Sequence, residues 1–473
     1  MLPSILLSSL LVASTQASPS SNQLQGKSIG IVRHRHPRSP ENLGHWAKSH
    51  RDGLLEKYGG GSSSGKTKRN SGTNLLTNQG ADSSFYGSLA IGTPPVAFYA
   101  ILDTGSADLW VADQKCTAGC RGVPTFDATA SSSYQNLSTP FQITYGSGAA
   151  RGNLGQDVIQ MAGFAIEDQT FATTDEVTEG VLSDPVSGIV GLGWQGISAA
   201  RIMPFWQVLA EEGLLSEPLM SFQLTRFNND TQVQQLEPGG TFTLGATNTS
   251  LYTGDIEYQN LVGNGNTYWL LSITTLTVQG NSIPLGSGTA SQAAIDTGTT
   301  LVGGPADAIA AIFDQIPGSQ PASGNYDGYY TYPCDTQVNV EMSFGGRTWT
   351  VSPADFRLAA IDDQSCLGAF FVLDIGGSAP AWIVGDTFLK NVYSVFRFDP
   401  PSVGFAALSG TALAMNGANI EPPTATIGTV ATATGRGNAA SSVHSGAMVV
   451  FSLLPPCPLF TVPPPPSLAR SRK

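Results

Sequence analysis

Two short segments of the sequence carry the same Asp-Thr-Gly triplet directly after an apolar run. The first is ILDTGSADLW, which contains Asp103, and the second is AIDTGTTLVG, which contains Asp296, 193 positions later. An Ile-Val-Gly triplet follows each segment and ends at Gly191 or Gly385, 88 and 89 residues beyond the respective aspartate. A single Asp-Thr-Gly arises easily by chance, but two copies with matched downstream triplets indicate an internal duplication. We therefore predict two homologous lobes, each presenting one carboxylate on a tight glycine turn.

The composition leaves few other groups for chemistry around these carboxylates. Residues 70–443 contain no histidine, which excludes Ser-His-Asp and Cys-His catalysis and most zinc sites in that region. The net charge of -12 argues against nucleic acid as a partner, because phosphate binding needs a basic surface. The chemistry must therefore use carboxylates, hydroxyls and backbone groups.

The segments between Asn70 and about Ser409 favour a strand-rich fold. With 54 Gly, 30 Pro and only 12% charged residues, the chain is rich in turns. Short runs of β-branched and aromatic residues predict strands, most clearly at 85–92, 141–148, 241–246, 269–278 and 391–399. Apolar spacing near 3.6 predicts helices only at 203–215, ended by Gly213, and at 305–316.

Five segments, in their order and spacing, resemble the pepsin-like aspartic proteases (peptidase family A1) in their secreted fungal form. They are ILDTGSADLWV, ITYGSGAARGNLG, SGIVGLG, AAIDTGTTLVGGP and AWIVGDTFLKNVYSVF, and the resemblance covers residues 70 to 409. It implies an all-β, bilobal fold with few short helices. Two pseudo-twofold-related, six-stranded, barrel-like lobes, residues 70–255 and 256–410, would enclose a cleft. The implied activity is that of a monomeric aspartic endopeptidase (EC 3.4.23.-) that cleaves proteins and peptides at acid pH. The resemblance implies inhibition by pepstatin-type transition-state analogues and no need for a cofactor or metal.

The resemblance also assigns a mechanism to the two aspartates. Two carboxylates about 3 Å apart cannot both ionise, so Asp103 and Asp296 would share one proton. Aspartic proteases are the standard example of this behaviour, so the separation of the two pKa values is expected from the resemblance. One carboxylate would take a proton from a bound water while the other donates to the scissile carbonyl.

The residues beside each aspartate would support the pair. Gly105 and Gly298 would allow the tight turns, and Thr104 and Thr297 would hydrogen-bond across to the opposite lobe. Ser106 and Thr299 would bind the outer carboxylate oxygens. Without the resemblance, ordinary turn capping would explain all four hydroxyls.

The segment ITYGSG at 143–148 resembles the family's flap, a hairpin over the cleft. Tyr145 would cover the substrate and hydrogen-bond Trp110, while Gly146 and Ser147 would bind substrate backbone. Some fungal relatives carry an aspartate at the Ser147 position that helps to accept lysine before the scissile bond. Its absence here predicts a preference for hydrophobic residues on both sides of the cut. Candidate walls of that pocket are Ile101, Leu182 and Ile189, for which core packing is an equally good explanation.

The five cysteines and three sequons fit a secreted protein. The resemblance implies disulfides Cys116–Cys120 and Cys334–Cys366 and leaves Cys457 without a role. Asn136, Asn229 and Asn248 begin glycosylation sequons.

The N-terminal region is predicted to be removed in two steps. Residues 1–17 have a short apolar core and small residues at the end, typical of a signal peptide, although a buried N-terminal element is an alternative. Secretion is therefore expected, with the vacuole or the cell surface as alternatives. Residues 18–69 favour a propeptide over a solvated basic arm, because residues 1–69 carry a charge of about +7 and the remainder -19.

The propeptide would act as an inhibitor. Within LLEKYGG, Lys57 and Tyr58 resemble the family element that inserts into the cleft. The dibasic pair Lys68-Arg69 is a processing site in a flexible linker. Activation could follow from acid, which weakens the attraction between the basic segment and the body, or from another protease that cuts at the pair.

Residues 411–473 are predicted to be a low-complexity, disordered tail. Asn438-Ala-Ala before an apolar run is compatible with a lipid-anchor signal, but the prolines and the basic end argue against it. A membrane partner is expected only if that signal is used.

Two other classes of protein compete with the protease interpretation. A catalytically silent relative could serve as a binding or inhibitory protein, but such relatives typically lose one Asp or the flap Tyr. The DTGTT segment also resembles the phosphate loop of actin-like and sugar-kinase ATPases, which would not explain the first Asp-Thr-Gly, the flap or the signal peptide.

Overall fold

The computed structural model describes most of the region between the two chain ends. The described residues are 71–228, 232–263, 267–373, 379–418, 420–423 and 431–433. The predicted signal peptide and propeptide, the sequon at Asn229 and Cys457 lie outside them. The same holds for Lys57, Tyr58, Lys68, Arg69 and the proposed anchor signal.

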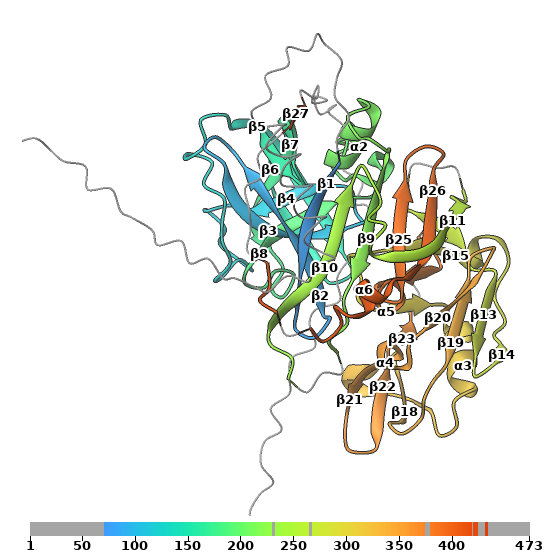
Figure 1. Ribbon diagram of the computed structural model, residues 1–473. Helices are drawn as coiled ribbons and strands as arrows, with labels where there is room; N and C mark the ends of the chain where they lie inside the picture. Colours follow the sequence, from blue (N-terminus) through green and yellow to red (C-terminus); the bar gives the residue numbers. More distant parts are fainter. Residues whose placement is uncertain are drawn as a thin grey trace, which may run out of the picture. The chain divides into compact units, whose positions relative to one another are not determined.

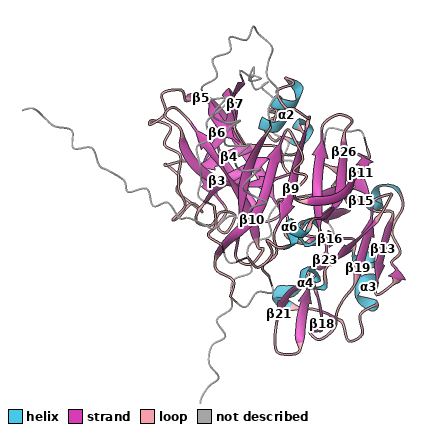
Figure 2. Cartoon of the chain, viewed as in Figure 1, coloured by secondary structure: helices cyan, strands magenta, loops and turns pink. Residues whose placement is uncertain are grey.

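The described chain is built mainly from β-strands, and Figure 2 shows how few helices lie among them. One sheet has 14 strands. In spatial order its main path is β11 (Tyr252–Asn260), β26 (Ser402–Leu408), β25 (Val392–Arg397), β9 (Leu219–Leu224), β10 (Leu236–Leu244), β1 (Gly72–Gln79), β2 (Ser84–Ile91), β3 (Val96–Asp103), β8 (Val186–Gly191), β4 (Leu109–Ala112), β7 (Phe164–Val177), β6 (Gly148–Met161) and β5 (Gln135–Tyr145). β27 (Ala431–Ala433) pairs in parallel with β7.

Three smaller sheets build the second lobe, and Figure 1 labels several of their strands, among them β13, β19 and β22. The first consists of β12 (Leu270–Ser272), β15 (Gln292–Ile295), β24 (Trp382–Val384), β16 (Val302–Gly304) and β23 (Phe370–Val372). The second consists of β14 (Asn281–Ser282), β13 (Thr275–Val278), β19 (Val340–Ser343) and β20 (Thr348–Val351). The third consists of β17 (Gln320–Pro321), β18 (Tyr330–Pro333), β22 (Ser365–Gly368) and β21 (Arg357–Ala360).

The helices in the described residues are short. They are α2 (Phe205–Glu211), α3 (Ala306–Asp314), α4 (Pro353–Phe356), α5 (Asp386–Leu389) and α6 (Gly410–Leu413). Single 3₁₀ turns occupy Gln195–Ile197, Gly288–Ser291 and Gly324–Tyr326. The two helices predicted from apolar spacing are therefore α2 and α3, and Gly213 adopts a left-handed φ of 66° just after α2. No helix among these is long and apolar enough to cross a membrane.

The duplication seen in the sequence is also present in the strand topology. In the first lobe β8 lies between β3, to which it is parallel, and β4, to which it is antiparallel. In the second lobe β24 lies between parallel β15 and antiparallel β16 in the same way. β4 then pairs in parallel with β7, as β16 does with β23. Each Asp-Thr-Gly turn thus connects two strands that flank an Ile-Val-Gly strand.

Two predicted boundaries fall inside elements of the structure. The expected division between lobes at 255/256 falls inside β11, which pairs with β26 near the C-terminus. The expected tail start at 411 falls inside α6, where the Ser409 hydroxyl caps the Ala412 amide and Ala412 is buried. Strand pairing continues from β10 through β9 to β25, so the large sheet contains strands from both the N-terminal and the C-terminal parts of the described chain.

Candidate active site

Both Asp-Thr-Gly turns begin where a buried strand ends beside its Ile-Val-Gly partner. Asp103 is the last residue of β3, and its carbonyl accepts a hydrogen bond from the Leu192 amide at 2.7 Å. Asp296 directly follows β15, and its amide donates to the Val384 carbonyl at 3.0 Å. The parallel pairing therefore fixes both turns at the same edge of their sheets.

Each carboxylate is fully buried and receives the same two donors. The Gly105 amide lies 2.8 Å from Asp103 Oδ1, and the Ser106 hydroxyl lies 2.5 Å from Asp103 Oδ2. The corresponding bonds in the second lobe are Gly298 N to Asp296 Oδ1 at 2.8 Å and Thr299 Oγ1 to Asp296 Oδ2 at 2.7 Å. Such donors favour the ionised carboxylate and hold its plane in one orientation.

Two threonines cross-link the turns through four reciprocal hydrogen bonds. The Thr104 hydroxyl donates to the Ile295 carbonyl at 2.8 Å and accepts from the Thr297 amide at 3.0 Å. The Thr297 hydroxyl donates to the Leu102 carbonyl at 2.6 Å and accepts from the Thr104 amide at 3.1 Å. Both threonines are buried, so these bonds lie away from competing water. They fix the two turns against each other.

The glycine of each turn faces the aspartate of the other. A Cβ on Gly105 would lie 2.5 Å from the carboxyl carbon of Asp296, and one on Gly298 would overlap the Asp103 carboxylate. Any side chain here would push the two carboxylates apart. Their proximity has an electrostatic consequence, because burial and then the Asp103 charge raise the pKa of Asp296 well above its usual value. The pair can therefore hold one proton across acid pH and titrates as a unit.

This pair of turns and its surroundings match a known family. The family of eukaryotic aspartyl proteases matches residues 84–408, which include both turns and the segments between them. The chain belongs to this family. It is an aspartic endopeptidase of the pepsin-like A1 type.

Individual relatives support the assignment across fungi and animals. The chain is 43% identical to "Major aspartyl peptidase 1" of Cryptococcus neoformans var. grubii over 353 residues, which cover 72% of each chain. It is 33% identical to "Pepsin A" of Sus scrofa over 69% of this chain and 82% of the relative. It is also 31% identical to "Aspartic-type endopeptidase ctsD" of Aspergillus fumigatus over 80% of this chain and 77% of the relative.

The segment predicted to be the flap of this aspartic protease forms the hairpin of β5 and β6. Tyr145 pairs with Gly148 across a two-residue turn, Gly146-Ser147, in which Gly146 is exposed and Ser147 half-buried. The Tyr145 side chain is buried, and its hydroxyl accepts a hydrogen bond from Trp110 Nε1 at 2.6 Å. Burial and then the Asp103 charge raise the pKa of Tyr145, so its hydroxyl stays protonated. Tyr145 thus lies within the electrostatic reach of Asp103.

The three candidate wall residues lie in one buried cluster with the flap tyrosine. Ile101, Leu182 and Ile189 are 5%, 7% and 0% exposed and share this cluster with Trp110 and Tyr145. Ile189 lies on β8 between β3 and β4, where it is enclosed on both sides. All three residues therefore pack the core, and a role in the substrate pocket is a proposal for them.

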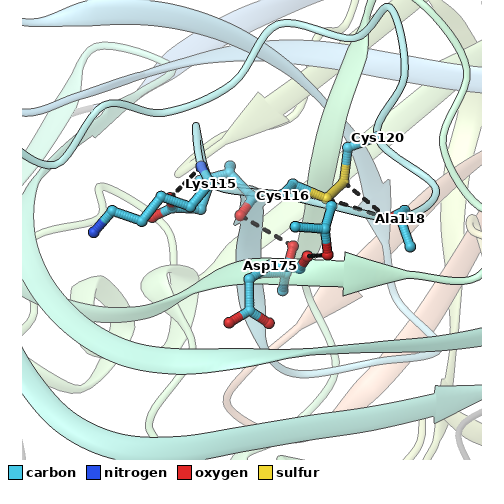
Figure 3. The surroundings of a disulfide bond; sticks show 9 residues. Lys115, Cys116, Ala118, Cys120 and Asp175 are labelled. Carbon is cyan, nitrogen blue, oxygen red and sulfur yellow. Dashed lines mark hydrogen bonds between the residues drawn. A yellow bond between two sulfur atoms is a disulfide. The ribbon is translucent and has the colours of Figure 1, made fainter.

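The structure forms both disulfides that the resemblance implied. Cys334 and Cys366 are bonded, with the Cys366 side chain in the core and Cys334 packed against it. Figure 3 shows the small loop closed by Cys116 and Cys120 against the segment with Asp175. The Thr117 amide of that loop donates to the Asp175 carbonyl at 2.9 Å. The loop is therefore attached to the end of β7.

Two of the three sequons lie among the described residues. Asn136 is exposed on β5, and its side-chain oxygen accepts from the Ser138 amide at 2.7 Å. Asn248 is half-buried, and its side-chain oxygen accepts from the Ser250 hydroxyl at 2.7 Å. Glycosylation of either position is a proposal.

Sequence reasoning missed a third carboxylate near the first turn. Asp108 is 4% exposed and accepts hydrogen bonds from the Ser198 hydroxyl and the Ala199 amide, both at 2.7 Å, and from the Ala200 amide at 3.1 Å. Burial raises its pKa from the usual value. It holds the loop after the first 3₁₀ turn against the strand that follows the Asp103 turn. In the sequence, the only indication of this role is the acidic residue five positions after Asp103.

Tyr268 is a second residue that the sequence did not single out. Burial and then the charges of Asp296 and Asp103 raise its pKa to about 12. Among the described residues, no group of three or more His, Cys, Asp or Glu side chains is arranged to hold a metal ion.

Proposed function

We propose that this enzyme cleaves proteins at acid pH through a water molecule held between Asp103 and Asp296. The observation that carries the proposal is the contact of each glycine turn with the opposite aspartate, which leaves two buried carboxylates side by side. The carboxylate that lacks the shared proton would act as general base on the water. The protonated one would donate to the scissile carbonyl. No covalent intermediate forms.

The supporting residues have separate roles in this proposal. Thr104 and Thr297 hold the turns together, while Ser106 and Thr299 orient the carboxylates. Tyr145 closes over the peptide and excludes water from the reacting bond. Gly146 and Ser147 bind substrate backbone at the tip of the flap.

We further propose that the chain is made as a secreted, inactive precursor. The signal-like residues 1–17, the two disulfides and the exposed Asn136 support the secretory route. Lys57 would lie between the two aspartates and block the water position. Removal after Lys68-Arg69 would complete activation.

The first test acidifies the purified full-length precursor to about pH 4, where one carboxylate of the pair is protonated. We expect cleavage of an unfolded protein at this pH and little cleavage near neutral pH. Pepstatin should abolish the cleavage, because it occupies the position of the tetrahedral intermediate.

The same assay contains its own control. A precursor in which Lys68 and Arg69 are both replaced by alanine distinguishes self-activation from cutting by another protease. If correctly processed chain cleaved nothing at any acid pH, a catalytically silent binding protein would be the better interpretation.

The flap tip offers a test of specificity through Ser147→Asp. In this proposal the apolar residues clustered with Tyr145 line the substrate pocket and would favour hydrophobic residues beside the scissile bond. A carboxylate at position 147 would pair with a lysine ammonium there, and we expect kcat/KM for a lysine-containing peptide to rise about tenfold. Ser147→Asn is the neutral control of similar size and should give no gain. A gain that is equal in both variants would contradict the electrostatic explanation.

A further inference from the structure

A largely buried cluster of ionisable side chains surrounds α5, next to the second Asp-Thr-Gly turn. Lys390, at the end of α5, is 3% exposed and places its Nζ 2.7 Å from Asp82 Oδ2 and 2.9 Å from Asp355 Oδ1. Arg226 donates from Nε to both oxygens of Asp355 at 2.9 Å and from a terminal nitrogen to Oδ2 at 2.5 Å. Asp386, at the start of α5, is 2% exposed and completes the cluster. We call these five residues the α5 cluster.

Stability alone is a weak reason for such a cluster. Buried ion pairs recover little more than the desolvation of their charges, and an apolar replacement of similar volume is often as stable. The α5 cluster nevertheless joins segments that are far apart in the sequence. Asp82 lies in the turn between β1 and β2, Arg226 follows β9 and Asp355 lies in α4. A buried polar network of this kind fixes one arrangement of those segments.

The N-terminal end of α5 holds the backbone of the second turn directly. The Asp386 amide donates to the Thr299 carbonyl at 2.8 Å, and the Thr387 amide donates to the Thr300 carbonyl at 2.8 Å. The Thr387 hydroxyl adds a bond to the same Thr300 carbonyl at 3.1 Å. Thr299 is the residue whose hydroxyl binds Asp296 Oδ2. Only two hydrogen bonds therefore separate the start of α5 from the Asp296 carboxylate.

The Asp82 side of the cluster holds the same turn from another direction. The Thr300 hydroxyl donates to the Ser83 carbonyl at 2.8 Å. Asp82 has a left-handed φ of 68°, and its Oδ1 accepts from Asn78 Nδ2 at 2.6 Å and from the Phe227 amide at 2.8 Å. The ion pair with Lys390 thus connects the β1–β2 turn to α5, and these two elements hold Thr300 between them.

The first turn has a different support. Counted from the Ile-Val-Gly glycine of each lobe, the positions of Asp386 and Lys390 are occupied by Leu192 and Gly196 in the first lobe. Asp108, five positions after Asp103, accepts several hydrogen bonds in the first lobe. The equivalent position in the second lobe is the apolar Leu301. The two lobes have therefore diverged. At these matched positions, an ion-paired side chain is found only beside the Asp296 turn.

We propose that Lys390 is a positioning residue for Asp296. By pairing Asp82 with Asp355, it holds the β1–β2 turn and α5 in the geometry that keeps Thr299 bonded to the Asp296 carboxylate. Lys390 touches neither substrate nor the reacting atoms. The proposal rests on the proposed catalytic role of Asp296.

The test compares Lys390→Met with Lys390→Arg in the processed enzyme, well below the unfolding temperature of either. We expect Lys390→Met to lower kcat at least tenfold, because even a small misplacement of a reacting group slows the chemical step. KM should stay within about twofold of wild type, because Lys390 does not touch the substrate. The pH profile of kcat should also shift, since the Thr299 bond favours the ionised Asp296. Lys390→Arg keeps the charge and should recover most of kcat.

Two further variants keep the result decisive. Thr300→Val leaves the α5 cluster intact but removes the bond to Ser83, and it should lower kcat severalfold even if Lys390→Met fails to fold. Phe313→Leu destabilises the distant core beside Tyr330 and should leave kcat unchanged.

The outcomes separate the two proposals. If wild type cleaves at acid pH, and Lys390→Met and Thr300→Val keep its kcat and pH profile with only a lower unfolding temperature, the α5 cluster is purely structural. If wild type itself cleaves nothing at acid pH, the proposed catalytic pair is wrong and the positioning role falls with it.

Discussion

Replacing Asp296 with asparagine should abolish proteolysis and leave the fold intact. Asparagine has the same shape and its oxygen can still accept from Thr299, but it cannot give up or share a proton. The general acid–base step then loses one of its two groups, and we expect kcat to fall by about 10³-fold or more. Peptide hydrolysis at acid pH, followed by mass spectrometry of the products, measures the loss.

The same substitution should make the folded enzyme more stable than wild type, and this difference should grow as pH increases. Burial and Asp103 raise the pKa of Asp296 in the folded protein, so the folded state holds a proton that the unfolded chain has released. That contribution is fully present below the unfolded pKa and is lost as pH rises through the folded pKa. Asparagine stays neutral, so Asp296→Asn should unfold at a higher temperature than wild type above about pH 5.

Asp307→Asn, at an exposed position on α3, is the matched control and should keep wild-type kcat. Retention of more than a few per cent of wild-type activity by correctly folded Asp296→Asn would contradict the shared-proton mechanism.

The pairing of the two Asp-Thr-Gly turns could be predicted because its signals are local and repeated. Asp103 and Asp296 each occupy a short motif with a glycine, and equal spacing to Gly191 and Gly385 revealed the duplication. The cross-lobe bonds of the threonines need that symmetry and follow from it. The boundaries of the α2 and α3 helices were also close, because apolar periodicity and a left-handed glycine are encoded within one segment.

The strand order was beyond reach of the sequence alone. β8 lies between β3 and β4, although β4 follows β3 after only a short turn and β8 comes much later in the chain. Parallel pairing between distant segments leaves no local signal, since each strand is only a short apolar run. The continuation of the fold into α6 was missed for a similar reason, because Ala/Gly-rich residues after Ser409 look like the tail that follows them.

The α5 cluster was invisible for an electrostatic reason. A charged residue in a sequence is usually solvated, so Asp82, Asp355 and Lys390 gave no sign of burial. Asp82 and Lys390 are separated by 308 positions and meet only when the fold is complete. Asp386 lies within the segment AWIVGDTFLKNVYSVF, but its burial depends on the same long-range packing.

Asp386→Asn should make the enzyme more resistant to unfolding as pH rises toward neutral. Asp386 is 2% exposed, and the described residues offer its Oδ1 no hydrogen-bond partner. The two cations of the cluster, Lys390 and Arg226, are already paired with Asp82 and Asp355. Burial raises the pKa of Asp386 well above its usual value, and the charges of Asp82 and Asp355 add to this effect against that of Lys390.

The direction of the pH effect follows from proton binding. The unfolded chain releases this proton near pH 4, whereas the folded protein retains it to higher pH. Between these two pKa values the folded state binds more protons, so its free energy of unfolding falls as pH rises, by up to about 1.4 kcal/mol per pH unit. The stabilisation is complete below the unfolded pKa and disappears as pH passes the folded one. Asparagine has no such dependence, so the advantage of Asp386→Asn over its parent should grow with pH.

Urea unfolding from about pH 4 to pH 7 measures this difference. The parent protein carries Asp296→Asn, so that neither self-digestion nor the titration of Asp296 affects the comparison. Thr387→Val is the control at the neighbouring buried position, because it disturbs the contact between α5 and Thr300 without adding or removing a titrating group. Its stability should differ from the parent by a constant amount at every pH. If the Asp386→Asn curve also ran parallel to the parent, Asp386 would be ionised in the folded protein. The charge balance of the α5 cluster would then require a further partner for it.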